Sequence, residues 1–281
     1  MNYNISSKNI DHPLLKPILE ELIPVFEKMG IKFFLIGAVA RDILMDLSGE
    51  KTGRATMDLD IAIAIDKWDE FEQLSDQVVS IPNFAKDNFQ KQRFIYKNNF
   101  ELDIVPYGNI KDQHDKIFWP PDQSFAMSVL GFEEAEKELL KIHLDNEINF
   151  EIVSLTGIFL LKLFAWKDRF HKTNKDADDI GFMLTNYLNI YRDLSFQEPY
   201  TKVYDLEEFT ELKAGAIILG IHLNEILSGS SKVREKLKSL LEEDIKRSEE
   251  SILINQIIET NKNLKFDEVK EGLHLINDQI K

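Results

Sequence analysis

The sequence contains no cysteine among its 281 residues. This absence excludes a disulfide framework, a thiolate metal site and a cysteine nucleophile, and it favours a cytosolic protein. Long apolar runs are missing too, because no stretch reaches the roughly 18 residues that a membrane span requires. The N-terminal residues MNYNISSKNIDH lack the charged-then-apolar pattern of a signal peptide. We therefore expect a cytoplasmic protein with no membrane partner.

Positive charge is scarce, since 34 Lys and Arg residues face 49 Asp and Glu residues, for a formal net charge of -15. Broad, sequence-independent nucleic-acid binding is disfavoured, because that affinity comes largely from Lys and Arg on phosphates. One window is locally basic and carries Lys162, Lys167, Arg169, Lys172 and Lys175. The same window carries Asp168, Asp176, Asp178 and Asp179. It is therefore either a docking patch for a polyanion such as tRNA or a self-paired, solvated helix end.

Several catalytic signatures are absent. The six histidines are scattered without HExxH spacing, so a zinc site is not expected. Neither GxxxxGK[ST] nor GxSxG occurs, so P-loop NTPases and serine hydrolases lack their motifs.

Hydrophobic periodicity predicts two domains, residues 1–153 with strands and helices and residues 154–281 with helices. Alternating or continuous apolar runs predict strands over 31–36, 58–65, 93–96 and 100–105, the last ending at Pro106, and a hairpin over 140–152. Helical spacing predicts helices over 13–29, 38–47, 68–79, 155–169, 176–187, 206–227 and 233–246. Gly30 is the expected cap of the first helix, and residues 107–123 are expected to form a loop. The fold class is thus α/β (α+β), a mixed sheet flanked by helices and followed by a mainly helical domain.

The strand in RATMDLDIAIAI carries two aspartates on one face. Asp58 and Asp60 stand two residues apart, which places their side chains about 6 to 7 Å apart along the strand. Glu101 and Asp103 share one face of another apolar strand, and we choose Asp103 as the third acid of the site. Clustered carboxylates repel unless something neutralises them, and a pair of Mg²⁺ ions, with Mn²⁺ as the alternative, would do so. The alternative without a metal site is an edge strand whose acids face solvent.

The stretch FFLIGAVARDIL predicts a phosphate-binding turn. A glycine between strand and helix lets the backbone approach a ligand, and the helix N-terminus offers free N–H groups to a triphosphate. Gly37 and Ala38 are therefore expected to cradle phosphate, with Arg41 adding a charged contact. Thr56 is expected to hydrogen-bond within the nucleotide site. The alternative for Arg41 is a local surface pair with Asp42.

Seven stretches together carry a family resemblance: LIGAVARDIL, RATMDLDIAIAI, ELDIVPYG, IFWP, VLGFEEA, LLKLFAWKDRF and KDADDI, within roughly residues 31–185. In this order they resemble the nucleotidyltransferases of the DNA polymerase beta superfamily, and more closely the AbiEii/AbiGii toxin family. The resemblance implies an NTP- and Mg²⁺-dependent enzyme that transfers an NMP to an RNA or other macromolecular hydroxyl. It also implies a toxin of a toxin–antitoxin or phage-defence pair, with tRNA as the favoured acceptor and a cognate antitoxin encoded nearby.

The resemblance assigns roles residue by residue. Asp58, Asp60 and Asp103 match the family's catalytic, metal-binding acids, and Gly37 matches its turn glycine. Lys162 matches a helical lysine that reaches phosphate, and Asp176 matches a late acid of the nucleotide site. Ala38 departs from the Gly-Ser or Gly-Gly that is usual in the superfamily, so a serine hydroxyl for the terminal phosphate is missing.

Three alternatives stay open. LIGAVARDIL followed by DLD is also similar to elements of CCA-adding tRNA enzymes and poly(A) polymerases, whose later arginine-rich motifs are not recognisable here. A second enzyme hypothesis is nucleotidylation of a partner protein or of a small molecule such as an aminoglycoside. The third is a nucleotide-binding module without catalysis, which the missing serine at Ala38 favours.

Overall fold

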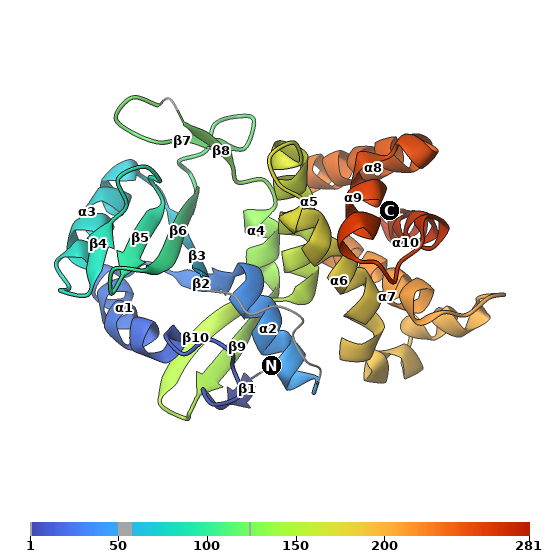
Figure 1. Ribbon diagram of the computed structural model, residues 1–281, viewed down its shortest axis with the longest axis horizontal. Helices are drawn as coiled ribbons and strands as arrows, with labels where there is room; N and C mark the ends of the chain where they lie inside the picture. Colours follow the sequence, from blue (N-terminus) through green and yellow to red (C-terminus); the bar gives the residue numbers. More distant parts are fainter. Residues whose placement is uncertain (1, 50–57, 124) are drawn as a thin grey trace. The chain divides into compact units, whose positions relative to one another are not determined.

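The computed structural model describes residues 2–49, 58–123 and 125–281. The chain forms two compact units, Met1–Ser154 and Leu155–Lys281. Their boundary lies where strands give way to helices, between β10 and α5 (Figure 1). Within the described residues, no helix is long and apolar enough to cross a membrane.

The first unit is built on an eight-stranded sheet of order β1-β9-β10-β2-β3-β6-β5-β4. Its strands are β1 (Asn2–Ile5), β2 (Phe33–Ile36), β3 (Asp58–Ile65), β4 (Phe84–Lys86), β5 (Arg93–Tyr96), β6 (Phe100–Gly108), β9 (Leu139–Leu144) and β10 (Ile148–Val153). The pairs β1–β9, β10–β2 and β3–β6 are parallel, and the other pairs are antiparallel. The sheet is therefore mixed, and β3 and β6 lie side by side near its centre.

Within the residues that the structure describes, this unit has four α-helices and one 3-10 turn. They are α1 (Leu15–Met29), α2 (Gly37–Leu47), α3 (Trp68–Val79), α4 (Phe132–Ala135) and η1 (Glu136–Glu138). Helix α3 packs on β3 and β4, α1 packs on α3 and β10, and α2 packs on β2 and β3. The core side of β3 is fully buried at Leu59, Ile61 and Ile63, as its period-two pattern predicts. Gly30 adopts a φ of +67° and ends α1, which confirms the expected left-handed cap.

The predictions for one strand and one loop of this unit differ from the structure by more than two residues, whereas the other predicted boundaries agree within two. Strand β6 continues through Pro106 to Gly108, because its partner β3 runs alongside for the whole length whereas β5 pairs only with Phe100–Asp103. A proline is tolerated where a strand edge has no neighbour to receive an N–H. The segment expected as a loop over 107–123 also contains β7 (Lys116–Phe118), which pairs with β8 (Ala126–Ser128) in a separate two-stranded sheet. Strands β1 and β4 were not expected, since each is only three or four residues long.

The second unit is entirely helical in its described elements. It comprises α5 (Leu155–Arg169), α6 (Lys175–Ile190), α7 (Glu211–Ile226), α8 (Ser231–Lys246), α9 (Ile252–Thr260) and α10 (Phe266–Gln279), with 3-10 turns η2 (Arg192–Phe196), η3 (Tyr200–Asp205) and η4 (Ser248–Glu250). The helix predicted from residue 206 begins only at Glu211, because the Thr210 side chain accepts a hydrogen bond from the Lys213 N–H at 3.2 Å and caps it there. A mixed sheet with helices followed by an all-helical region confirms the predicted fold class.

Candidate active site

The acids of β3 and β6 form one acidic face on the sheet. The parallel register sets Asp58 opposite Glu101 and Asp60 opposite Asp103. Leu59 and Leu102, which alternate with them, are fully buried on the core side, so the four acids share the other side of the sheet. Neighbouring strands are about 4.8 Å apart, so Asp60 and Asp103 are direct cross-strand neighbours. The sequence places two acids on each strand, and the strand pairing makes them a two-by-two array.

Arg93 is a member of this site that the sequence analysis did not identify. It lies opposite Asp103 in the antiparallel pair of β5 and β6. Its Nε donates to Asp103 Oδ1 at 2.8 Å, its Nη2 donates to Asp103 Oδ2 at 3.0 Å, and its Nη1 contacts the Glu101 carboxylate. The hydrogen bond to Asp103 raises the pKa of the Arg93 guanidinium, although partial burial opposes the shift. One arginine therefore partly neutralises two of the four acids.

The alternation of side chains along β5 could have indicated Arg93 from the sequence. In the strand RFIY, Phe94 and Tyr96 are fully buried, so Arg93 and Ile95 must face the other side. Which strand lies next to β5, and therefore which acid meets Arg93, depends on the register and is not visible in the local pattern.

The acidic face has the type of donor that a divalent metal needs, but the side chains are not gathered around one point. Three carboxylates on adjacent parallel strands are the hard oxygen ligands that Mg²⁺ prefers. As the side chains stand, no three His, Cys, Asp or Glu residues of the described chain gather closely enough to hold an ion. Both oxygens of Asp103 accept from Arg93 instead. Since an ionised carboxylate has about four acceptor positions, Asp103 can keep an arginine contact and still offer a lone pair to a metal.

Gly37 lies directly against the acidic face. Strand β2 ends at Ile36 and helix α2 begins at Gly37, whose φ is +70°. A Cβ atom at this position would overlap the Oδ2 atom of Asp60. Only glycine combines this left-handed backbone with room for the carboxylate. The N-cap residue of α2 is Ile36, whose side chain cannot accept a hydrogen bond, and the first turn, which includes Ala38, presents its backbone N–H groups at the end of the helix next to Asp60.

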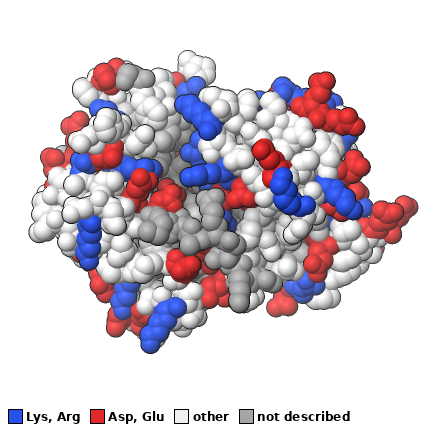
Figure 2. All heavy atoms as spheres, viewed as in Figure 1, with Lys and Arg blue, Asp and Glu red and all other residues white. Residues whose placement is uncertain are grey.

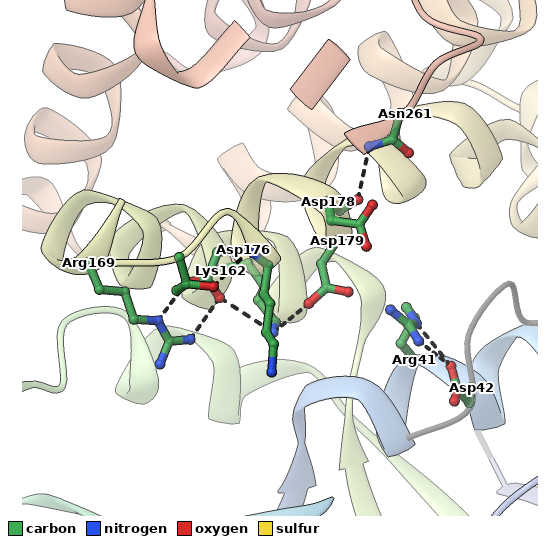
Figure 3. A network of polar contacts seen from close by, with 10 residues as sticks. Arg41, Asp42, Lys162, Arg169, Asp176, Asp178, Asp179 and Asn261 are labelled. Carbon is green, nitrogen blue, oxygen red and sulfur yellow. Dashed lines mark hydrogen bonds and ion pairs between the residues drawn. The ribbon is translucent and has the colours of Figure 1, made fainter. Parts of the chain in front are cut away.

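Arg41 is buried within α2, with only 4% of its surface exposed. Its Nε and Nη2 donate to Asp42 Oδ1 at 2.9 and 2.8 Å (Figure 3). The pair between Arg41 and Asp42 considered above is thus present, and it is a buried pair rather than a surface pair. Thr56, also predicted in the nucleotide site, lies outside the described residues.

Lys162 and Asp176 belong to the helical unit and contact each other. Lys162 Nζ on α5 lies 2.6 Å from Asp179 Oδ2 and 3.5 Å from Asp176 Oδ1 on α6 (Figure 3). Arg169 donates to both oxygens of Asp176, at 2.6 and 2.8 Å. Burial opposes ionisation of Asp176, but the hydrogen bonds from Arg169 and the charge of Lys162 hold the pKa of its carboxyl below the usual value. The structure therefore unites two predicted residues, Lys162 and Asp176, and adds Asp179 and Arg169.

The buried aspartates change the balance of the basic window. Asp176 and Asp179 are at most 2% exposed and turn toward Lys162 and Arg169. The exposed side chains of the window are Lys167, Asp168, Arg169, His171, Lys172 and Lys175. Lys167 pairs with Glu243 at 3.3 Å. Three of the five basic residues of the window, Lys162, Lys167 and Arg169, are thus paired with acids, and Lys172 and Lys175 are exposed beside them.

Comparisons with known proteins are sparse. No protein-family model matches the sequence, and a search of curated proteins gave no match. Among solved structures, ANT(2'')-Ia in complex with adenylyl-2''-tobramycin is similar at a TM-score of 0.33 and 9% identity, over 58% of this chain and 84% of that chain. The solution structure of the same antibiotic-resistance factor gives a TM-score of 0.35 at 10% identity, over 67% and 94%. A tRNA-processing enzyme in an apo form gives 0.25 at 14%, over 95% and 89%. Similarities of this size carry no conclusion about activity or substrate.

Proposed function

We propose that this chain is a metal-dependent nucleotidyltransferase that moves an NMP from an NTP to a hydroxyl group. The observation that carries the proposal is the register of the acidic face, where Asp58 and Asp60 of β3 stand beside Asp103 of β6. The N-terminus of α2, where Gly37 lies against Asp60, supplies the second element, a set of backbone N–H groups for phosphate oxygens.

Each residue has a role in this reaction. Asp58, Asp60 and Asp103 would hold Mg²⁺ or Mn²⁺, which when bound neutralises phosphate charge and favours the alkoxide form of the acceptor. Asp103 accepts the proton of the acceptor hydroxyl, and Arg93 positions its carboxylate. The acceptor oxygen bonds to the α-phosphorus, the bond to the bridging oxygen of the β-phosphate breaks, and pyrophosphate leaves. The backbone at Gly37 and Ala38 binds the departing phosphates, with Arg41, Thr56, Lys162 and Asp176 assigned to nucleotide binding.

The acceptor in this proposal is tRNA. The exposed Lys172 and Lys175, between the end of α5 and the start of α6, support a polyanionic acceptor, because exposed cations attract phosphates. The resemblance to the AbiEii/AbiGii toxins supports a toxin of a toxin–antitoxin or phage-defence pair, with a cognate antitoxin. Modification of tRNA by such an enzyme would block translation.

Transfer of label from each α-labelled NTP into total tRNA, with Mg²⁺ present, tests this function. The Asp58→Asn/Asp60→Asn variant removes the paired acids of β3. A matched control is Glu72→Gln/Asp76→Asn, which removes two exposed acids of α3 and so changes the net charge equally. We expect label in tRNA for the wild type and the control and none for the paired aspartate variant. Label in protein or in a small molecule instead of tRNA would support the alternative hypothesis, in which the acceptor is a partner protein or a small molecule.

A nucleotide-binding module without catalysis is the second candidate. The observation that favours it is the engagement of both Asp103 oxygens by Arg93, together with the missing serine at Ala38. Calorimetry of NTP binding with and without Mg²⁺ separates the two functions. A catalytic site should bind NTP much more tightly with the metal, whereas a module that has lost catalysis should bind with little metal dependence.

A further inference from the structure

Three exposed aromatic rings stack in a row on the helical unit. Phe196, Tyr204 and Phe209, here called the aromatic row, come from the segment between α6 and α7. The Phe196 and Tyr204 centroids are 5.7 Å apart with ring planes 23° from parallel, and those of Tyr204 and Phe209 are 5.9 Å apart at 7°. Their residues are 67%, 50% and 47% exposed. Large apolar groups rarely gather at the surface unless the patch has a binding role.

The row is held in place from below. The Tyr204 hydroxyl lies 2.8 Å from Ser195 Oγ, and Ser195, which is fully buried, donates to the Arg192 carbonyl at 2.7 Å. The central ring thus has a buried anchor and two stacked ring neighbours. A binder would not need to order these side chains, and preorganisation of this kind improves affinity.

Exposed acids are concentrated in the segment that carries the aromatic row. The segment carries Asp193, Glu198, Asp205, Glu207 and Glu208 at the surface, against only two basic residues, Arg192 and Lys202. Arg192 is engaged by Glu211 at 2.8 Å. Figure 1 shows the segment projecting from the helical unit beside α7, and Figure 2 shows acidic side chains gathered at the outermost point of that projection. The row therefore lies within a negative field.

We propose that the aromatic row and its acids form a docking surface for a basic polypeptide segment of a partner protein. Arginine suits this surface best, because its planar guanidinium stacks on aromatic rings and pairs with carboxylates at the same time. A polynucleotide would stack on the rings equally well, but its phosphates would meet the acids and be repelled. A second copy is disfavoured, because a two-fold contact would set the same acids against each other. The inference does not depend on the transfer reaction proposed above.

Binding of a labelled peptide of alternating arginine and leucine, followed by fluorescence anisotropy, tests the surface on the full chain. We expect the arginine peptide to bind, its affinity to fall with added salt, and the matched peptide with glutamate in place of arginine not to bind. Phe196→Ala and Phe209→Ala should each weaken binding about tenfold, the effect of losing a moderate hot spot. Asp205→Asn/Glu207→Gln should weaken binding and flatten its salt dependence.

Three controls keep the test decisive. Phe89→Ala removes an 88% exposed phenylalanine from the other unit and should change nothing. Glu249→Gln/Glu250→Gln removes two exposed acids of the same unit outside the segment and should have little effect. Because Phe196 is mostly exposed, its variant should keep the wild-type melting temperature.

The inference is overturned if the arginine peptide binds no better than the glutamate peptide, or if the row variants bind it as the wild type does. Binding of single-stranded RNA that is lost in Phe196→Ala would make the row a nucleic-acid platform instead. A sedimentation mass that falls to that of a monomer in the same variant would make it a self-association surface.

Discussion

Removal of Arg93 should destabilise the folded protein, because the carboxylates of the acidic face repel one another. Arg93 makes two hydrogen bonds to Asp103 and a contact to Glu101, and Asp60 is the neighbour of Asp103 on the other side. In Arg93→Ala, Asp103 and Glu101 lose their cation, and Asp103, whose side chain is only 16% exposed in the wild type, still has Asp60 as its cross-strand neighbour. The variant should therefore be less stable than the wild type at neutral pH.

The magnitude follows from the geometry. A hydrogen bond to a charged group contributes about 1.5–3 kcal/mol, and a bidentate arginine pair lies at the favourable end. The side chain of Arg93 is 22% exposed, so water screens part of this energy. We expect a coupling energy between Arg93 and Asp103 of about 2 kcal/mol in the free energy of unfolding. Arg93→Lys should recover only part of it, because a single ammonium cannot pair with both oxygens.

A double-mutant cycle measures this energy by urea unfolding of the wild type, Arg93→Ala, Asp103→Asn and the double variant. The exposed pair of Arg192 and Glu211 is a matched control, since an exposed single contact should couple by less than about 1 kcal/mol. If the effects of Arg93→Ala and Asp103→Asn are simply additive, Arg93 does not support the acidic face and its role in positioning Asp103 fails.

Three further predictions concern single residues. Gly37→Ala should lower the free energy of unfolding by more than the roughly 1–2 kcal/mol that a left-handed backbone costs an alanine, because the new Cβ displaces Asp60. Gly30→Ala is the control, since Gly30 also has a positive φ but nothing lies within 4 Å of its Cβ position. An equal loss of stability in both variants would contradict the contact between Gly37 and Asp60. Burial, assisted by the charge of Lys91, lowers the pKa of Lys86 to about 8, so Lys86→Met should raise the free energy of unfolding at pH 7 by about 1–2 kcal/mol. This gain should shrink as the pH rises from about 8 through 10.5, above which the amine is neutral in both states, and a gain independent of pH would refute the charge as its cause. Burial also lowers the pKa of His222 to about 4 from 6.5, so the unfolded state accepts a proton that the folded state resists, and the free energy of unfolding should fall by about 3 kcal/mol as the pH drops from 6.5 to 4. In denaturant titrations across this range, the free energy of unfolding of His222→Gln should depend less on pH than that of the wild type. Parallel pH dependences in the two proteins would exclude the histidine as the source.

Much of the local structure could be predicted because it depends on short periods. The alternation from Asp58 to Ile65 gave the strand, its buried side and the common face of Asp58 and Asp60. The apolar face ending at Gly30 gave α1 and its cap. Errors occurred where pairing with another strand decides the outcome: β6 passes Pro106 because β3 pairs with it, and β7 forms because it pairs with β8.

The sequence by itself determined the residue types of the candidate site, since the acids, the turn glycine and the helical lysine stand in recognisable local patterns. Tertiary structure alone decided their partners. It set Arg93 against Asp103, placed Lys162 between Asp176 and Asp179, and stacked Phe196, Tyr204 and Phe209 from a segment with no periodic pattern. The physical reason is that periodicity fixes which way a side chain points from its own element, whereas the charge or ring that it meets depends on strand register and helix packing between residues far apart in the chain.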